Sequence, residues 1–112
     1  MTQEPHTPLL DRIGRPADLK TLSDADLRRV ADELRKAGDV KAIGLGVNEN
    51  EVCMDALEIG NWNVFLLAGR YTLLEQTPLD TLYPACRAAG TSIICGGPFN
   101  SGILAGREMW NY

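Results

Sequence analysis

Three short aliphatic runs, separated by amphipathic segments that end in glycine, constrain the fold more than any other feature of this chain. The runs lie at 40–47, 64–68 and 92–95, which gives a period of roughly 25 residues. They are apolar almost throughout and do not alternate between apolar and polar residues. Because such strands are typical of parallel sheets covered on both faces, we predict a βαβαβ unit with right-handed crossovers.

Two amphipathic helices are expected between these strands. Asn48 and Glu51 form a capping-box pattern for the first helix, which should end at Gly60. Thr77, followed by a proline, should begin the second helix, and Gly90 should end it. The residues expected to face the core are Val52, Cys53, Ala56, Leu57, Leu79, Leu82, Tyr83 and Cys86.

The residues before this unit differ from it in composition. Segment 1–22 contains three prolines, so we expect it to be extended and poorly ordered. Segment 23–37 predicts an amphipathic helix, with Ser23 as its cap and Gly38 as its stop. The predicted organisation is therefore an extended segment, a helix with a solvated charged face, and a strand–helix unit over 38–112.

Composition argues against several functional classes. The chain has 15 acidic and 11 basic residues and a net charge of -4, which does not favour nucleic-acid binding. It shows neither a signal peptide nor an apolar run near the roughly 20 residues of a membrane span, so a cytoplasmic protein is expected. The histidine, His6, lies in the extended segment. The three cysteines, expected to be buried apolar residues without zinc-ligand spacing, are Cys53, Cys86 and Cys95.

Polar residues follow the predicted carboxyl end of each strand. Asn48 follows the first strand, Arg70 and Tyr71 follow the second, and the glycine-rich segment 96–102 follows the third. Because the carboxyl ends of parallel strands meet at one edge of a sheet, we expect these turns to converge there. Adjacent glycines allow backbone N–H groups to approach an anion, and Ser101 adds a hydroxyl. This pattern predicts a site for a nucleotide phosphate.

Simpler interpretations remain open at each of these turns. Segment 96–102 also fits an ordinary glycine-rich turn, and Arg70 also fits a structural ion pair with Glu75. Gly44 and Gly46 suggest a dinucleotide-binding fingerprint, but Glu49 stands where the third glycine belongs. A carboxylate there would repel a pyrophosphate, so we reject that fingerprint.

The three strand-and-turn segments resemble one enzyme family. The sequence VKAIGLGVN at 40–48 is similar to the fifth strand of aldo-keto reductases. FLLAGRYTLLEQ at 65–76 and GGPFNSGIL at 96–104 resemble the branch containing D-threo-aldose 1-dehydrogenase, L-fucose dehydrogenase and pyridoxal 4-dehydrogenase. This resemblance covers about residues 38–112. It implies an α/β fold, with the three strands as the fifth to seventh of a (β/α)8 TIM barrel.

The resemblance also implies a function and a cofactor. Such enzymes transfer hydride between NAD(P) and a sugar or aldehyde, with the cofactor at the carboxyl ends of the strands and Asn48 near its nicotinamide amide. The expected cofactor-binding residues are Asn48, Tyr71, Gly97, Phe99, Asn100, Ser101 and Gly102. Gly96 replaces an aromatic that relatives stack on nicotinamide, and Ala68 replaces an amide-binding glutamine.

No catalytic residue is expected in this sequence. By the resemblance, the family's catalytic Asp, Tyr, Lys and His come from the first four strands, which have no counterpart here. Hydride transfer then lacks its general acid. We therefore expect weak or absent NAD(P) binding, and no turnover by this chain alone.

A second resemblance lies near the N-terminus. Residues 7–36, which include PLLD, PADL and LSDADLRRVADELR, resemble the N-terminal segment of 1-deoxy-D-xylulose-5-phosphate synthase. That family's glycine–histidine thiamine motif has no match, so we expect no thiamine chemistry. The chain thus resembles a fusion joined at about Lys36.

Two other functions remain open. The first is a non-catalytic interaction module that self-associates through exposed sheet edges, without nucleic acid or membrane partners. The second is a non-functional fusion product.

Overall fold

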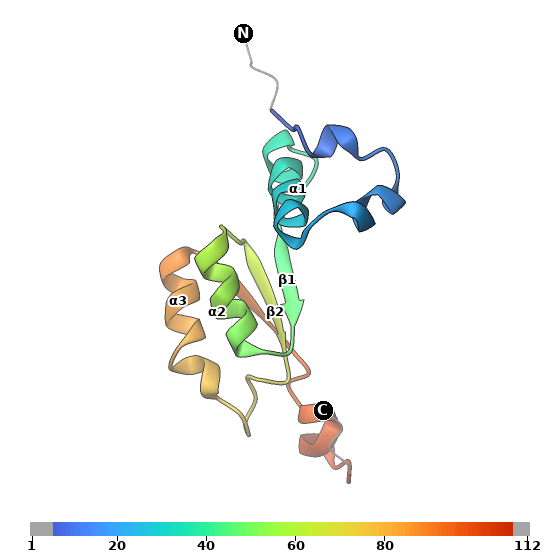
Figure 1. The fold of residues 1–112 in the computed structure, drawn as a ribbon. Helices are drawn as coiled ribbons and strands as arrows, with labels where there is room; N and C mark the ends of the chain where they lie inside the picture. Colours follow the sequence, from blue (N-terminus) through green and yellow to red (C-terminus); the bar gives the residue numbers. More distant parts are fainter. Residues whose placement is uncertain (1–5, 109–112) are drawn as a thin grey trace. The chain divides into compact units, whose positions relative to one another are not determined.

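The computed structural model describes residues 6–108, which divide between Ile43 and Gly44 into two compact units (Figure 1). In the part of the chain that is described, no helix is long and apolar enough to cross a membrane. The three predicted strands and the helices between them all belong to the second unit.

The first unit is built around helix α1 (Asp24–Ala37). Its predicted ends are confirmed. The Ser23 hydroxyl accepts a hydrogen bond from the Asp26 backbone N–H at 3.2 Å, and Gly38 ends the helix with a left-handed φ of 86°. Acidic residues in the first turn and basic residues in the last turn both complement the helix dipole.

Segment 6–22 is more regular than the predicted extended chain, because it forms the 3-10 helices η1 (Leu10–Arg12) and η2 (Pro16–Thr21). Carboxylates accept hydrogen bonds from backbone N–H groups at the start of both helices, that of Asp18 within η2 and that of Glu33 for η1. The buried Glu33 of α1 accepts from the backbone N–H groups of Leu9 and Leu10, at 3.0 and 2.8 Å. Turn and helix contacts that the prolines did not suggest therefore organise this segment. Residues 1–5 lie outside the described part.

The second unit confirms the predicted α/β architecture. Strands β1 (Gly44–Val47), β2 (Val64–Ala68) and β3 (Ser92–Gly96) form a parallel sheet in that order. Helix α2 (Asn50–Ile59) connects the first two strands, and helix α3 (Leu82–Ala89) lies between the last two. Parallel pairing brings all three carboxyl ends to one edge of the sheet.

The start of the first strand and the start of the helix after it differ from the prediction. Strand β1 begins at Gly44, not at residue 40, because β2 begins at its partner Val64 and offers no pairing for earlier residues. Helix α2 ends at Gly60 as predicted, but Asn48 does not cap it. The backbone N–H of Asn48 donates to the Glu49 carboxylate at 3.1 Å, and Glu49 takes the N-cap position without a side-chain cap.

The second connection is broken where one helix was predicted. Thr77–Leu79 forms the short 3-10 helix η3, and α3 begins only at Leu82. Pro84 explains the break, because it has no N–H to donate to Asp80 in a continuous helix and fits only the first turn. Gly90 ends α3 in a left-handed conformation, as predicted.

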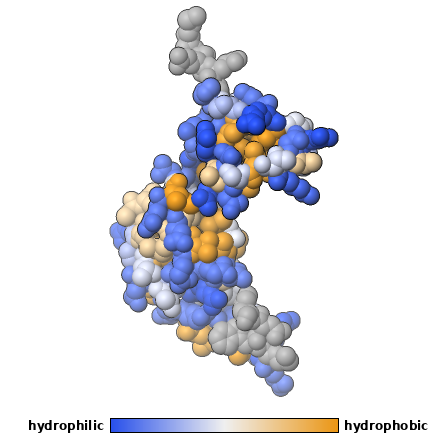
Figure 2. Space-filling model, in the orientation of Figure 1, coloured by the Kyte–Doolittle hydropathy of each residue, from blue (hydrophilic) through white to orange (hydrophobic). Residues whose placement is uncertain are grey.

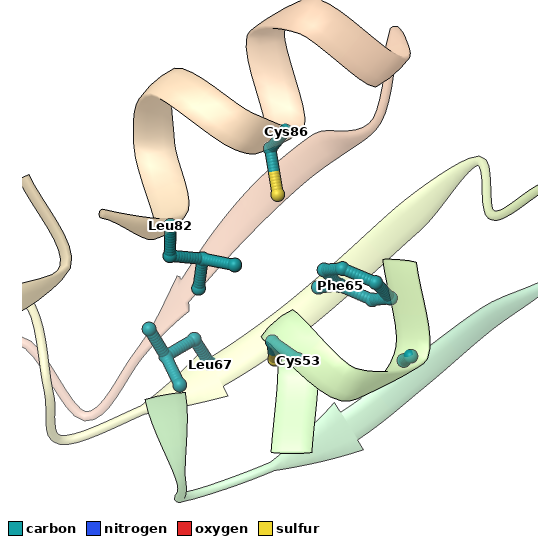
Figure 3. Close-up of a cluster of buried hydrophobic side chains, with 6 residues drawn as sticks. Cys53, Phe65, Leu67, Leu82 and Cys86 are labelled. Carbon is teal, nitrogen blue, oxygen red and sulfur yellow. The ribbon is translucent and has the colours of Figure 1, made fainter. Parts of the chain in front are cut away.

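The core lies between the two helices and one face of the sheet (Figure 3). Its buried members are Cys53, Ala56, Phe65, Leu67, Leu82 and Cys86. Burial first, and then the nearby Cys86 and Glu49, raise the pKa of the Cys53 thiol to about 11, so it stays protonated and apolar. Val52 and Leu79, predicted to face inward, are instead exposed, and so is Cys95.

The other face of the sheet is open, contrary to the prediction of burial on both faces. Leu66 of β2 is 44% exposed and Ile94 of β3 is 53% exposed. Figure 2 shows apolar surface on this unit. The strands are apolar on both faces, but α2 and α3 cover only one of them.

Replacing the core residue Leu82 by alanine should lower the free energy of unfolding by about 2–5 kcal/mol, because the change leaves a cavity beside Phe65 and Cys86. Urea denaturation measures the change. The matched control is Leu73→Ala, at a leucine that is 83% exposed, which should change the value by no more than about 0.5 kcal/mol. Equal effects of the two variants would show that the core lies elsewhere.

Glu33→Ala should weaken the attachment of the N-terminal segment to α1, because two backbone N–H groups lose their acceptor. We expect amide hydrogen exchange at Leu9 and Leu10 to quicken by about tenfold or more, as about 1.4 kcal/mol of lost protection implies. The exposed Glu58→Ala on α2 serves as the control. Unchanged exchange at both amides would show that the Glu33 carboxylate does not hold the N-terminal segment.

Candidate functional site

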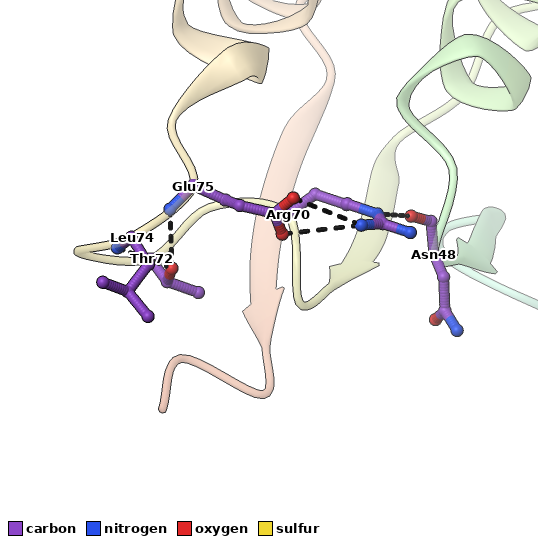
Figure 4. A network of polar contacts seen from close by, with 5 residues as sticks. All are labelled: Asn48, Arg70, Thr72, Leu74 and Glu75. Carbon is purple, nitrogen blue, oxygen red and sulfur yellow. Dashed lines mark hydrogen bonds and ion pairs between the residues drawn. The ribbon is translucent and has the colours of Figure 1, made fainter. Parts of the chain in front are cut away.

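The turns after β1 and β2 are joined by Arg70 (Figure 4). Its Nε donates to the backbone carbonyl of Asn48 at 2.7 Å, and its Nη1 lies 3.3 and 3.5 Å from the two carboxylate oxygens of Glu75. The predicted structural pair of Arg70 with Glu75 is therefore present. The same guanidinium fixes the backbone of Asn48 and leaves that residue exposed at the sheet edge.

The turn after β2 is also closed from within and tied to β3. The Thr72 hydroxyl accepts from the backbone N–H groups of Leu74 and Glu75, at 3.1 and 3.0 Å. The Gly69 N–H donates to the carbonyl of Gly96, at the end of β3, at 2.8 Å. All three turns thus belong to one edge of the sheet, as the parallel order predicted.

The glycine-rich segment after β3 turns repeatedly through the left-handed region. It leads into the irregular helix η4 (Asn100–Ala105). Its residues with positive φ are Gly97, Asn100, Ser101, Gly102 and Gly106. This backbone curls around an open hollow of about 550 Å³, lined by Gly97, Pro98, Phe99, Ser101, Gly102, Ala105 and Arg107.

Arg107 is the residue in this hollow that sequence reasoning missed. Its backbone N–H donates to the carbonyl of Gly102 at 3.0 Å, which returns the chain to the glycine-rich turn. A guanidinium beside flexible glycines and a serine hydroxyl suits a phosphate group. The sequence shows an arginine shortly after the glycine-rich segment, but only the left-handed turns at 101 and 102 bring this arginine back to the hollow.

The predicted site residues do not all line this hollow. Gly97, Phe99, Ser101 and Gly102 do, whereas Asn48 and Tyr71 lie on the two other turns. Asn100 has no exposed surface, and within residues 6–108 neither its Oδ1 nor its Nδ2 has a hydrogen-bond partner. Phe99 is 59% exposed beside it.

Tyr71 packs on another aromatic ring. Its ring centroid lies 4.7 Å from that of Tyr83, with 49° between the planes. The Tyr83 hydroxyl lies 3.4 Å from Sγ of Cys95. Burial, and next the hydrogen bond with Cys95, raise the pKa of Tyr83 well above its ordinary value, which favours the protonated phenol.

The site suits an organic anion better than a metal. Within residues 6–108, no group of three or more His, Cys, Asp or Glu side chains is placed to hold a metal ion. The hollow instead offers glycine backbone, a hydroxyl and a guanidinium. These groups, together with the buried carboxamide of Asn100 beside them, fit the phosphate part of a nucleotide cofactor.

Comparison with known proteins agrees with the fold. The sequence profile of the Aldo/keto reductase family matches residues 10–111. It starts earlier than the resemblance over 38–112 that the motifs predicted. No solved structure gives a significant match.

Two curated relatives are oxidoreductases by name. Pyridoxal 4-dehydrogenase from Microbacterium luteolum is 43% identical over 88 residues, which cover 75% of this chain and 26% of that protein. D-threo-aldose 1-dehydrogenase from Pseudomonas sp is 39% identical over 77 residues, covering 69% of this chain and 23% of the relative. The chain thus spans about a quarter of the length of these relatives.

A third relative agrees with the second predicted resemblance. 1-deoxy-D-xylulose-5-phosphate synthase from Psychrobacter arcticus is 64% identical over 33 residues, which cover 30% of this chain but 5% of that enzyme. So short a share carries no functional assignment. The profile match covers nearly the whole sequence, and the parallel strand–helix unit agrees with it: this chain belongs to the aldo/keto reductase family.

Proposed function

We propose that this chain forms part of an NAD(P)-dependent oxidoreductase that acts on a sugar or an aldehyde. Family membership supports the reaction class. The names of the two dehydrogenase relatives support the substrate class, since one names an aldose and the other names pyridoxal, an aldehyde. The chain spans about a quarter of these relatives, so the activity of the whole enzyme is a proposal here.

The observation that carries the proposal is the hollow after β3. Gly97 and Gly102 allow a phosphate to approach the backbone, and the Ser101 hydroxyl and the Arg107 guanidinium supply a donor and a positive charge. This hollow lies after the carboxyl end of a parallel strand, where α/β sheets bind nucleotides. We assign it to the phosphates of NAD(P).

We propose that Asn48 and Tyr71 contact the nicotinamide end of the cofactor. Arg70 holds the backbone of Asn48, and the exposed Asn48 carboxamide would bind the nicotinamide amide. Tyr71 already packs against Tyr83 and offers the rest of its ring to a planar group. When bound, NAD(P) supplies or accepts the hydride.

We propose no turnover by these 112 residues alone. The resemblance assigns the family's proton donor and its Asp, Lys and His neighbours to four strands that this sequence does not match. Tyr83 does not replace that donor, because its hydroxyl is already engaged with Cys95 and its ring with Tyr71. The proposed role of the chain is therefore cofactor binding within a larger barrel.

Calorimetric titration with NADP and with NAD tests the cofactor site. We expect weak binding, with a Kd on the order of 1 mM, because only part of the site is present. Arg107→Met should weaken binding by about tenfold or more through the loss of one charge-assisted contact. Arg87→Met, at an arginine outside this hollow, should leave the affinity unchanged.

Two results would count against the proposal. One is an absence of binding by the unaltered chain at several times the expected Kd. The other is equal binding by the Arg107 and Arg87 variants, which would place the ligand away from the hollow.

The open face of the sheet favours a second candidate function, a self-associating module. Leu66 and Ile94 expose apolar surface there, and β1 and β3 are the outer strands of the three-stranded sheet. A second copy of the chain offers the same apolar face and parallel-pairing edges, and so can bury both. We propose a second copy as the occupant.

Sedimentation velocity tests this module. We expect the chain to sediment as a dimer or larger species, and Ile94→Lys to shift it to monomer because it puts a charge on the open face. Leu73→Lys makes the same change on an exposed leucine of the turn after β2, and should leave the assembly intact. A monomeric chain at high concentration would exclude the module.

A further inference from the structure

We propose that three residues of the turn after β2 act in series as positioning residues for Asn48: Thr72, Glu75 and Arg70. The affinity for the nicotinamide end of a dinucleotide then depends on a buried threonine hydroxyl. This inference rests on the proposed cofactor site. It goes beyond that site by assigning a role to residues that do not line the hollow after β3.

Thr72 is the first member of the series. It is 7% exposed and lies in the turn 69–76, which contains neither helix nor strand. Its hydroxyl accepts from the backbone N–H groups of Leu74 and Glu75, at 3.1 and 3.0 Å, and its own N–H donates to the Glu75 carbonyl at 2.8 Å. These hydrogen bonds hold the backbone of Glu75 in a segment without regular structure.

Glu75 connects this turn to Arg70. Its two carboxylate oxygens lie 3.3 and 3.5 Å from Nη1 of Arg70, so the guanidinium has a charged partner within the same turn. Nε of the same planar group donates to the carbonyl of Asn48 at 2.7 Å. A guanidinium suits both contacts because its N–H groups point in fixed directions, a geometry that a lysine ammonium does not reproduce.

Asn48 is the residue at which the series ends. Arg70 binds its backbone carbonyl, and its backbone N–H donates to the Glu49 carboxylate at 3.1 Å. The residue is nevertheless exposed at the edge of the sheet. Because both backbone groups are bonded, Asn48 has less conformational freedom to lose when its carboxamide binds a ligand. A smaller loss of freedom strengthens binding.

The exposure of the ion pair argues against a purely structural role. The side chains of Arg70 and Glu75 are 39% and 30% exposed, and ion pairs so accessible to water contribute little to stability. The contacts of the series nevertheless lead to one backbone carbonyl at the sheet edge where the polar turns converge. We therefore expect the series to affect Asn48 more than it affects folding.

NMR titration of the full chain with two ligands tests the series. The ligands are NADP and its nicotinamide-free counterpart, phospho-ADP-ribose, which share the phosphates. Arg70→Met should weaken NADP binding by about fivefold or more, the value of one hydrogen bond, and leave the nicotinamide-free ligand within about twofold. Arg87→Met, on α3, is the matched control and should change neither affinity.

Variants of Thr72 test the remote end of the series. Thr72→Val replaces the hydroxyl by a methyl group of similar size, and should weaken NADP binding selectively, as Arg70→Met does. Thr72→Ser keeps the hydroxyl and should bind NADP like the unaltered chain. Because the hydroxyl acts through Arg70, adding Thr72→Val to Arg70→Met should cost less than about twofold more. Additive losses would show that the two residues act separately, and would overturn the series.

The free chain gives a readout that needs no ligand. NMR relaxation should show a more mobile Asn48 backbone in Arg70→Met and in Thr72→Val, and the urea midpoint of Arg70→Met should stay close to that of the unaltered chain. Unchanged mobility at Asn48, or equal loss of both ligands, would overturn the positioning role. Binding of neither ligand by the unaltered chain, with Asn48 still responding to both variants, would instead refute the proposed cofactor site, so the two failures are distinct.

Discussion

The packing of two helices on one face of the parallel sheet is the constraint on which the second unit depends. Phe65 and Leu67 of β2 contribute the central apolar surface, and α2 and α3 close over it with Cys53, Leu82 and Cys86. Because the connections through α2 and through α3 each carry the chain back across the sheet, the strands run parallel and their carboxyl ends share one edge. The polar turns converge as a consequence of this topology.

The three turns are stabilised by different interactions. Arg70 joins the first two through the Asn48 carbonyl and the Glu75 carboxylate, so they are held before any ligand arrives. In the third turn, left-handed backbone returns Arg107 toward Gly102.

Local signals predicted much of this fold. Ser23, Gly38, Gly60 and Gly90 mark helix ends as expected, and the apolar runs gave the strands and their parallel order. The predictions are wrong where contacts between residues far apart in the sequence determine the local structure. Glu33 binds the backbone of the N-terminal segment, which the prolines predicted to be extended. Arg70 binds the backbone of Asn48, which the sequence predicted to be a helix cap. Within the site, motif position identified the glycine loop, but Arg107 required a backbone path that spacing does not reveal.

We propose that the hollow after β3 binds the phosphates of a nucleotide. Backbone amide NMR spectra recorded during titration with NADP test this proposal most directly. We expect the amides of Gly97, Ser101, Gly102 and Arg107 to shift together and saturate, while those of α1 stay in place. Saturable shifts confined to other residues, or no shifts at all, would contradict it.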